Sequence, residues 1–235
     1  MSAAGDQDAE WAEFLDRLVH DLREPLRSVH AFSELLCETA KDRLGGDGEE
    51  AIREILSGTT RIRTLVDGLS GYSLALRESA DTDDLQSASL QLAFDIVLDA
   101  LGEQVRAYGA TVTAENLPRV SVGLERLMQL LESLIGNSLK FQGDAPPVVR
   151  VSARPEADGW AIEVEDNGIG IDPADSERVF KPFTRIHGRK HPGAGLGLTI
   201  CRRIVQAHGG EIRMGPRAQG GSICTFWLPA ETPAG

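Results

Sequence analysis

One histidine near the start of the chain has neighbours that suit nucleophilic chemistry. His20 lies two positions from both Leu18 and Leu22, so on a helix it points roughly opposite an apolar stripe, toward solvent. Asp21 follows it directly, and Pro25 is expected to interrupt the helix because it lacks a backbone donor. An adjacent carboxylate can hold one ring nitrogen and fix the tautomer, which leaves the other nitrogen to attack. A solvated surface histidine at a tolerated kink has the same local sequence, so both interpretations stay open here.

Farther along, three segments carry residue types that suit a nucleotide. Ser133, Asn137 and Lys140 repeat at spacings of four and three, which makes a polar stripe on an otherwise apolar helix. An asparagine on such a stripe can ligate Mg²⁺, and a lysine can contact phosphate. A predicted strand runs into the turn Asp166–Gly170, which puts a carboxylate at a strand end. The glycine-rich segment 193–198 leads directly into a helix, whose free amides and dipole favour phosphate.

The charge distribution narrows the possible partners. The 235 residues include 24 basic and 36 acidic side chains, for a formal net charge of −12. This argues against nucleic acid and anionic membranes, since both require a basic surface. Within this acidic chain, one stretch contains only bases and no acids, which favours a polyanion site there. Its members are Arg178, Lys181, Arg185, Arg189, Lys190, Arg202 and Arg203.

The elements that carry the first histidine are two long helices. Apolar residues in each recur at spacings of three, four and seven, and the turn Gly45–Gly48 separates them. One hairpin cannot cover both stripes, so we expect a homodimer that closes a four-helix bundle through residues 7–80. The polar segment Glu78–Gln86 is expected to be a hinge. The stripes are Trp11, Leu15, Leu18, Leu22, Leu26, Val29 and Leu36, and Ile52, Ile55, Thr59, Ile62, Val66, Leu69 and Leu76.

The second half alternates between helical and strand patterns, which predicts an α/β sandwich with helices on one face of a mixed sheet. Expected helices are 93–109, 123–141 and 196–208. Expected strands are 110–114, 119–122, 148–153, 160–166, 211–214 and 222–228.

Other signals are weak. No apolar run approaches the roughly 18 residues of a membrane span, and the acidic start lacks the features of a signal peptide. Cys37, Cys201 and Cys224 are isolated, so neither a disulfide framework nor a zinc site is indicated. We therefore expect a cytoplasmic protein without a membrane span.

Taken singly, each nucleotide-like segment could be a turn or a solvated helix face, but together they occur in an order that resembles the sensor histidine kinases. The segment 20–26 (HDLREPL) resembles their H box, 137–141 (NSLKF) the N box and 166–170 (DNGIG) the G1 box. The segment 180–183 (FKPF) resembles the F box and 193–198 (GAGLGL) the G2 box. The resemblance runs from about residue 9 to 229 and is greatest to the phytochrome-type branch. It implies an α+β protein, a dimeric helical hairpin (residues 7–80) followed by a GHKL-type (Bergerat) ATP-binding domain (residues 86–230).

The resemblance also implies roles. His20 would accept the γ-phosphoryl group of ATP on Nε2, and Asp21 would orient or deprotonate the imidazole. Asn137 would hold Mg²⁺, Lys140 would contact phosphate and Asp166 would bond the adenine amino group. The phosphoryl group would pass to an aspartate of a response regulator, and a separate sensor or input module would act upstream. The pocket and a mobile lid between residues 172 and 193 would be shaped by Gly168, Gly170, Gly193, Gly195, Gly197 and Leu198.

Two positions depart from the family pattern. Ser133 stands where the N box usually has a first asparagine, so the metal shell is altered, and Glu24 stands where strong phosphatases have Thr or Asn. GHKL-type ATPases hydrolyse ATP with a glutamate at the position of Ser133; Glu132 is its neighbour, about 100° off that helix face. Hydrolysis is therefore disfavoured. A dimeric phosphotransfer adaptor, which needs the histidine but not ATP, is the other alternative, and the Asp166 and glycine motifs argue against it.

Overall fold

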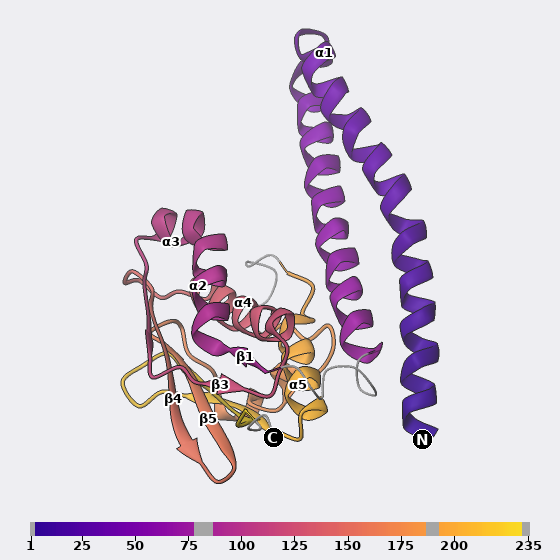
Figure 1. Cartoon of the computed structure of the whole chain (residues 1–235). Helices are drawn as coiled ribbons and strands as arrows, with labels where there is room; N and C mark the ends of the chain where they lie inside the picture. Colours follow the sequence, from indigo (N-terminus) through magenta and orange to yellow (C-terminus); the bar gives the residue numbers. More distant parts are fainter. Residues whose placement is uncertain (1–2, 78–86, 187–192, 232–235) are drawn as a thin grey trace. The chain divides into compact units, whose positions relative to one another are not determined.

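The computed structural model describes residues 3–77, 87–186 and 193–231, which form two compact units. One unit is a long helical hairpin and the other is an α/β domain (Figure 1). The predicted hinge, Glu78–Gln86, and residues 187–192 of the predicted lid lie outside the described residues. In the described part of the chain, no helix combines the length and apolar character needed to cross a bilayer.

The hairpin is the element α1 (Ala3–Arg77), whose two arms meet at Gly45. The backbone there has φ 63° and ψ 175°, a left-handed φ that glycine adopts without a steric penalty. The turn predicted at Gly45–Gly48 is therefore confirmed at its first residue. Pro25 lies inside the first arm, which keeps helical dihedral angles around it. The predicted interruption is wrong in this respect, because one missing backbone donor does not end a helix of this length.

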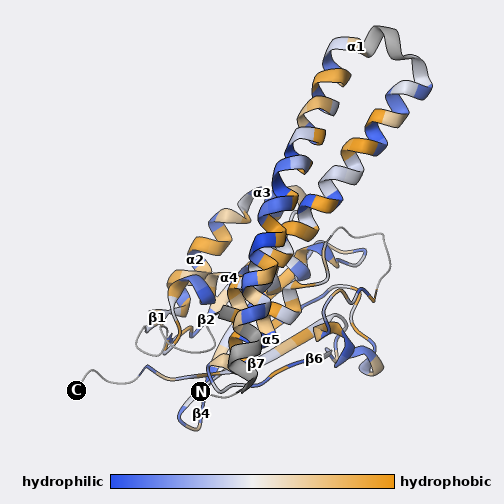
Figure 2. Ribbon diagram, turned by 90° about the vertical axis from the view of Figure 1, so that its right-hand side faces the viewer, coloured by the Kyte–Doolittle hydropathy of each residue, from blue (hydrophilic) through white to orange (hydrophobic). Residues whose placement is uncertain are grey.

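Each predicted apolar stripe divides between two faces. In the first arm, Leu15 is buried together with Ala12 and Val19, whereas most of the stripe is exposed. In the second arm, buried positions at a spacing of seven residues alternate apolar with polar: Ile52, Thr59, Val66 and Ser73. Ala75 and Leu76 are also buried. A two-helix contact covers only a narrow face of each helix, so the remaining apolar residues stay exposed in the single chain, which agrees with the expectation that one hairpin cannot cover both stripes. Figure 2 shows hydrophobic residues along both arms; the exposed ones include Trp11, Leu18, Leu22, Val29, Leu36, Ile55 and Ile62.

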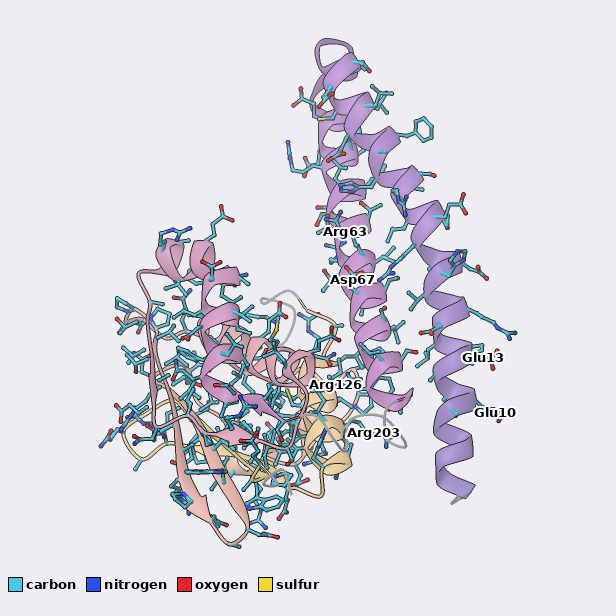
Figure 3. All side chains as sticks on the ribbon, viewed as in Figure 1. Glu10, Glu13, Arg63, Asp67, Arg126 and Arg203 are labelled. Atoms are coloured by element: carbon cyan, nitrogen blue, oxygen red, sulfur yellow. The ribbon has the colours of Figure 1, made fainter. Side chains whose placement is uncertain are left out.

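Polar contacts between the arms fix their register. The Ser73 hydroxyl donates to the carbonyl oxygen of Ala12 at 2.9 Å. The Arg23 guanidinium lies 3.3 Å from the carboxylate of Asp67, which Figure 3 labels on the second arm. Glu13, also labelled in Figure 3, pairs with Arg17 within its own arm and is exposed. A register shift would leave the buried hydroxyl of Ser73 without a partner, which costs about 1–3 kcal/mol.

The α/β domain contains a five-stranded sheet in the order β2-β4-β5-β7-β6. β2 and β4 are parallel and the other neighbours are antiparallel, which confirms the predicted mixed sheet. A two-stranded sheet, β1 (Ala88–Ser89) with β3 (Arg119–Val120), lies at the entry to the domain. The five strands are β2 (Thr111–Glu115), β4 (Val148–Glu156), β5 (Gly159–Asp166), β6 (Ile212–Pro216) and β7 (Ser222–Pro229).

The helices lie on one face of the sheet, as predicted. They are α2 (Leu90–Ala100), α3 (Gly102–Tyr108), α4 (Leu124–Lys140) and α5 (Gly197–Ala207). Alternate strand residues such as Val151 and Ile162 join the helices in the core, whereas their neighbours Arg154 and Glu163 pair on the opposite face. The predicted helix 93–109 is in fact two helices, because the backbone leaves helical geometry at Leu101, immediately before a glycine.

Candidate active site

His20 lies on the first arm of the hairpin with 83% of its side chain exposed. Its Nδ1 is 3.1 Å from Oδ1 of Asp21, which is 79% exposed. An ionised carboxylate can only accept, so in this contact Nδ1 carries the proton and donates it. The lone pair of the neutral ring is then on Nε2, on the nitrogen that Asp21 does not contact. This is the tautomer that a histidine nucleophile requires.

The other histidine of the first arm, His30, has both ring nitrogens engaged. Its Nδ1 is 2.8 Å from Oγ1 of Thr59 on the second arm, and its Nε2 is 3.3 Å from the Glu34 carboxylate. The Thr59 hydroxyl already donates to the Leu56 carbonyl, so it must accept from His30. Only 22% of the His30 side chain is exposed. It therefore serves as an inter-arm contact, and its nitrogens are not directed to a substrate.

Asp166 ends β5 and is held by contacts from three directions. Its Oδ1 accepts from the amide of Gly168 at 2.8 Å and from that of Ser222 at 3.0 Å. The Ser138 hydroxyl, from α4, lies 3.4 Å from Oδ2. Burial raises the pKa of the Asp166 carboxyl above its ordinary value, and these hydrogen bonds oppose the rise. A carboxylate fixed in this way at a strand end can accept a hydrogen bond from a ligand amino group.

The turn after Asp166 has no room for side chains at its glycines. A Cβ on Gly168 would be 2.3 Å from the carbonyl oxygen of Phe141, at the end of α4. That same oxygen accepts from the amide of Ile169 at 3.0 Å. Gly170 has a φ of 76° and faces the backbone of Gly221. The turn is thus packed against the end of α4 on one side and the start of β7 on the other.

Asn137 and Lys140 come from the last turns of α4, and both are half-buried. Among the described residues, the Asn137 side-chain amide has no hydrogen-bond partner. Burial lowers the pKa of the Lys140 ammonium, and the charge of Arg185 lowers it further. Two cations this close favour an anion between or beside them. The Lys140 ammonium also lies 4.7 Å from the centre of the Phe141 ring.

Ser133, four residues before Asn137 on α4, contacts the start of α5. A Cβ added to Gly197 would lie only 2.5 Å from the Oγ of Ser133. The Ser133 hydroxyl also bonds to the Cys201 thiol. Ser133 therefore packs against the first turns of α5. Glu132, its neighbour, is exposed.

The glycine-rich segment before α5 is only partly brought to the site. Gly195 (φ 71°) packs on the backbone of Phe183 and Thr184, and Gly197 begins α5. No described side chain caps α5, so its first amides remain free to meet an anion. Leu198 is partly buried against the core. Gly193 borders residues 187–192, which lie outside the described residues.

The basic stretch is less available to a ligand than its sequence suggested. Arg178 pairs with Asp175, and Arg202 pairs with Glu177 at 2.9 Å. Arg202 also stacks on the ring of Phe180 at 4.1 Å. Acids that precede the stretch thus neutralise two of its bases. Arg189 and Lys190 lie outside the described residues, and Arg185 is near enough to Lys140 for its charge to lower the pKa of that ammonium.

The donor set suits a magnesium ion that arrives with a nucleotide. The described residues contain no group of three or more His, Cys, Asp or Glu side chains that could enclose a metal. Mg²⁺ typically keeps several waters and binds through one or two protein oxygens together with substrate phosphates. The unbonded amide of Asn137 can supply one such oxygen.

Gly168→Ala is expected to damage the site through its backbone. Because the new Cβ would overlap the carbonyl of Phe141, the turn must move, which should lower the free energy of unfolding by roughly 1–3 kcal/mol. Nucleotide binding should weaken with it. Gly215→Ala, in β6, is the control, because nothing lies within 4 Å of its Cβ. Equal melting temperatures and nucleotide affinities for the two variants would contradict this account.

Several site residues could not be found from the sequence. Ser222 bonds to Asp166 across 56 positions, so no local pattern connects them. Ser138 follows Asn137 but shares a helix face with the buried Leu134, so helix geometry separates it from the polar stripe. Arg185 was one of seven bases, and only its proximity to Lys140 distinguishes it.

Comparisons with known protein families divide the chain at the same place as the fold. Residues 10–75 match the "His Kinase A (phospho-acceptor) domain". Residues 123–232 match the "Histidine kinase-, DNA gyrase B-, and HSP90-like ATPase" family.

Similar curated proteins include two from cyanobacteria. The chain is 35% identical to cyanobacterial phytochrome A of Nostoc sp. and 32% identical to phytochrome-like protein Cph1 of Synechocystis sp.. Each match covers 94% of this chain but only 29% of the relative, so the chain spans less than a third of their length.

Solved structures share the fold. Full-length ShkA, solved in complex with AMPPNP, has a TM-score of 0.68 at 24% identity, over 94% of this chain and 46% of that one. The catalytic domain of histidine kinase ThkA has a TM-score of 0.54 at 25% identity, over 61% of this chain and 94% of that one.

Proposed function

Because the chain belongs to the sensor histidine kinases, in the branch that includes the phytochromes, we propose that it is a protein-histidine kinase that phosphorylates itself on His20. The observation that carries this proposal is the exposed imidazole whose Nδ1 faces the Asp21 carboxylate. The proposed domains are residues 7–80, for dimerisation and phosphate acceptance, and residues 86–230, for ATP binding.

The residues of the α/β domain support ATP as the phosphoryl donor. Asp166 is fixed to accept a hydrogen bond from the adenine amino group. Lys140 is the last residue of α4, and the charge of Arg185 acts on it. These two positive charges can neutralise the phosphates of ATP. When bound with ATP, Mg²⁺ would neutralise the charge that develops on the phosphate oxygens, with Asn137 as its protein ligand.

The chemistry proposed for His20 is an in-line displacement. The Nε2 lone pair attacks the γ-phosphorus, an N–P bond forms, and the bond from that phosphorus to the β–γ bridging oxygen breaks, releasing ADP. The ring becomes positive as the bond forms, because Nδ1 keeps its proton. Asp21 then accepts a stronger hydrogen bond from Nδ1 and can take up that proton.

The later fate of the phosphoryl group is also a proposal. Phosphohistidine would pass it to an aspartate of a response regulator receiver domain. A separate sensor or input module would set the rate, which agrees with a chain that spans less than a third of its phytochrome relatives. Glu24 is exposed one turn from His20, and we propose that phosphatase activity toward the regulator is weak.

Two alternative functions predict different results. A GHKL-type ATPase needs a general base near the metal, and at the family's position Ser133 is a hydroxyl that packs against Gly197. A phosphotransfer adaptor needs no nucleotide site, so the fixed carboxylate of Asp166 and the uncapped start of α5 argue against it.

The decisive experiment is incubation of the chain with γ-labelled ATP and Mg²⁺, followed by acid and base. A kinase of this type acquires label that acid removes and base leaves intact, as a phosphohistidine requires. Label that resists acid, or release of labelled phosphate without labelled protein, would contradict the proposal.

Dimerisation is expected to reside in the hairpin, because its described residues leave apolar side chains exposed along both arms. Residues 1–84 alone should form a helical dimer, and residues 86–235 a monomer that still binds ATP. Ile62, 46% exposed on the second arm, should be buried in the dimer. Ile62→Asp should therefore weaken association by about 100-fold or more, since each buried side chain of this kind contributes ~1.5–3 kcal/mol.

Light scattering on the two fragments measures this directly. Thr64→Asp is the matched control, because Thr64 is exposed and lies about 200° around the helix from Ile62. A monomeric fragment 1–84, or a dimeric fragment 86–235 formed through the exposed Leu92 and Ile96 of α2, would refute this arrangement.

A further inference from the structure

The side chain of Asn167, next to Asp166, makes two hydrogen bonds to a single stretch of backbone. Its Oδ1 accepts from the amide of Val148 at 2.7 Å, and its Nδ2 donates to the carbonyl of Pro146 at 3.0 Å. In a pair of parallel strands, one residue bonds to the carbonyl before and to the amide after the residue opposite it. The side-chain amide of Asn167 thus makes the two hydrogen bonds that a neighbouring parallel strand would make on either side of Pro147.

The start of β4 depends on this side chain. Pro147 cannot donate, and its carbonyl accepts from the amide of Thr111 on β2 at 2.8 Å. On the opposite side, toward the end of β5, the Val148 amide and the Pro146 carbonyl are bonded by Asn167. Without the side-chain amide of Asn167, the Val148 amide and the Pro146 carbonyl would need water as their hydrogen-bond partner.

These bonds lie between the two halves of the nucleotide site. The connection from α4 to β4, residues 141–147, follows directly on Asn137 and Lys140. It is tied to the turn after β5 twice, by the bond from Ile169 to the carbonyl of Phe141 and by the side chain of Asn167. The backbones also approach closely, since a Cβ on Gly143 would be 3.8 Å from the carbonyl oxygen of Asn167. Asn167 thereby links the base end of the site to the phosphate end.

We propose that Asn167 is a positioning residue for the nucleotide base, acting through Asp166 and the α4–β4 connection. This inference rests on the proposed ATP site and adds a determinant of affinity and base preference to it. The side-chain amide is used up by Pro146 and Val148, so Asn167 acts without contacting the base. Its loss should loosen the Asp166 carboxylate relative to α4, and a site that is less preorganised binds its ligand more weakly.

The test measures KM and kcat for autophosphorylation of the full chain with ATP, and the dissociation constants for ATP and GTP. Asn167→Ala removes both bonds, and should raise KM about tenfold while kcat stays within twofold. The ratio of the dissociation constants for GTP and ATP should become smaller. Asn167→Asp keeps the acceptor for the Val148 amide but places a carboxylate oxygen against the Pro146 carbonyl oxygen, which it repels. This variant should therefore also raise KM. Asn116→Asp, at an exposed turn residue, is the control and should change neither constant.

KM and kcat together distinguish a positioning role of Asn167 from a loss of folded protein. A partly unfolded preparation lowers the apparent kcat but not KM, so a raised KM in the folded fraction is informative even if Asn167→Ala melts early. Wild-type KM and base preference in both Asn167 variants would overturn the inference, and so would a fall in kcat at unchanged KM. Absence of ATP binding by the unaltered chain would instead overturn the proposed function.

Discussion

Replacing His20 by glutamine is expected to abolish labelling by γ-labelled ATP, a loss of at least about 100-fold, because it removes the nucleophilic nitrogen. Within the described part of the chain, Asp21 bonds to the ring alone, at an exposed site, so the fold should not change. ATP binding and dimerisation should stay at the level of the unaltered chain. Measurement of all three separates loss of the acceptor from loss of structure.

His30→Gln is the matched control for this prediction. His30 bonds to Thr59 across the hairpin, so its replacement should lower the melting temperature of the hairpin slightly and leave the label in place. Loss of label in His30→Gln with its retention in His20→Gln would show that the acceptor has been assigned to the wrong histidine.

Asn137→Asp is expected to reduce labelling by on the order of 100-fold. The change places a negative charge where the triphosphate should lie and alters the oxygen that meets the metal. Because Asn137 makes no side-chain hydrogen bond to a described residue, the melting temperature should hardly move. Phosphohistidine formation and a thermal melt should be measured on the same preparation.

Asn116→Asp makes the same chemical change at an exposed turn and should label normally. If Asn137→Asp also labels normally, Asn137 does not hold the metal. If it melts well below the unaltered chain, its part in the fold is larger than the contacts of α4 indicate.

Features that depend on local order along the chain could be predicted from the sequence. The exposure of His20 followed from its angle to the apolar residues on one helix, and the carboxylate after it needed no tertiary information. The alternation of β5 and the helical stripe of α4 predicted elements close to those observed. The order of five short motifs was enough to indicate the family, because each motif is continuous in the chain.

Which helix faces pack together could not be predicted from local order, because it depends on how the elements are arranged in space. The stripe of the second arm divides into buried positions such as Thr59 and open ones such as Ile62, because this depends on where the first arm lies. Helix geometry places Ser133 on one stripe with Asn137, but the contact of Ser133 with Gly197 at the start of α5 depends on tertiary packing. Asp166 bonds to Ser222 at the start of β7, and Asn167 bonds to Val148 at the start of β4. These partners are far apart in sequence, so no periodic pattern could have identified them.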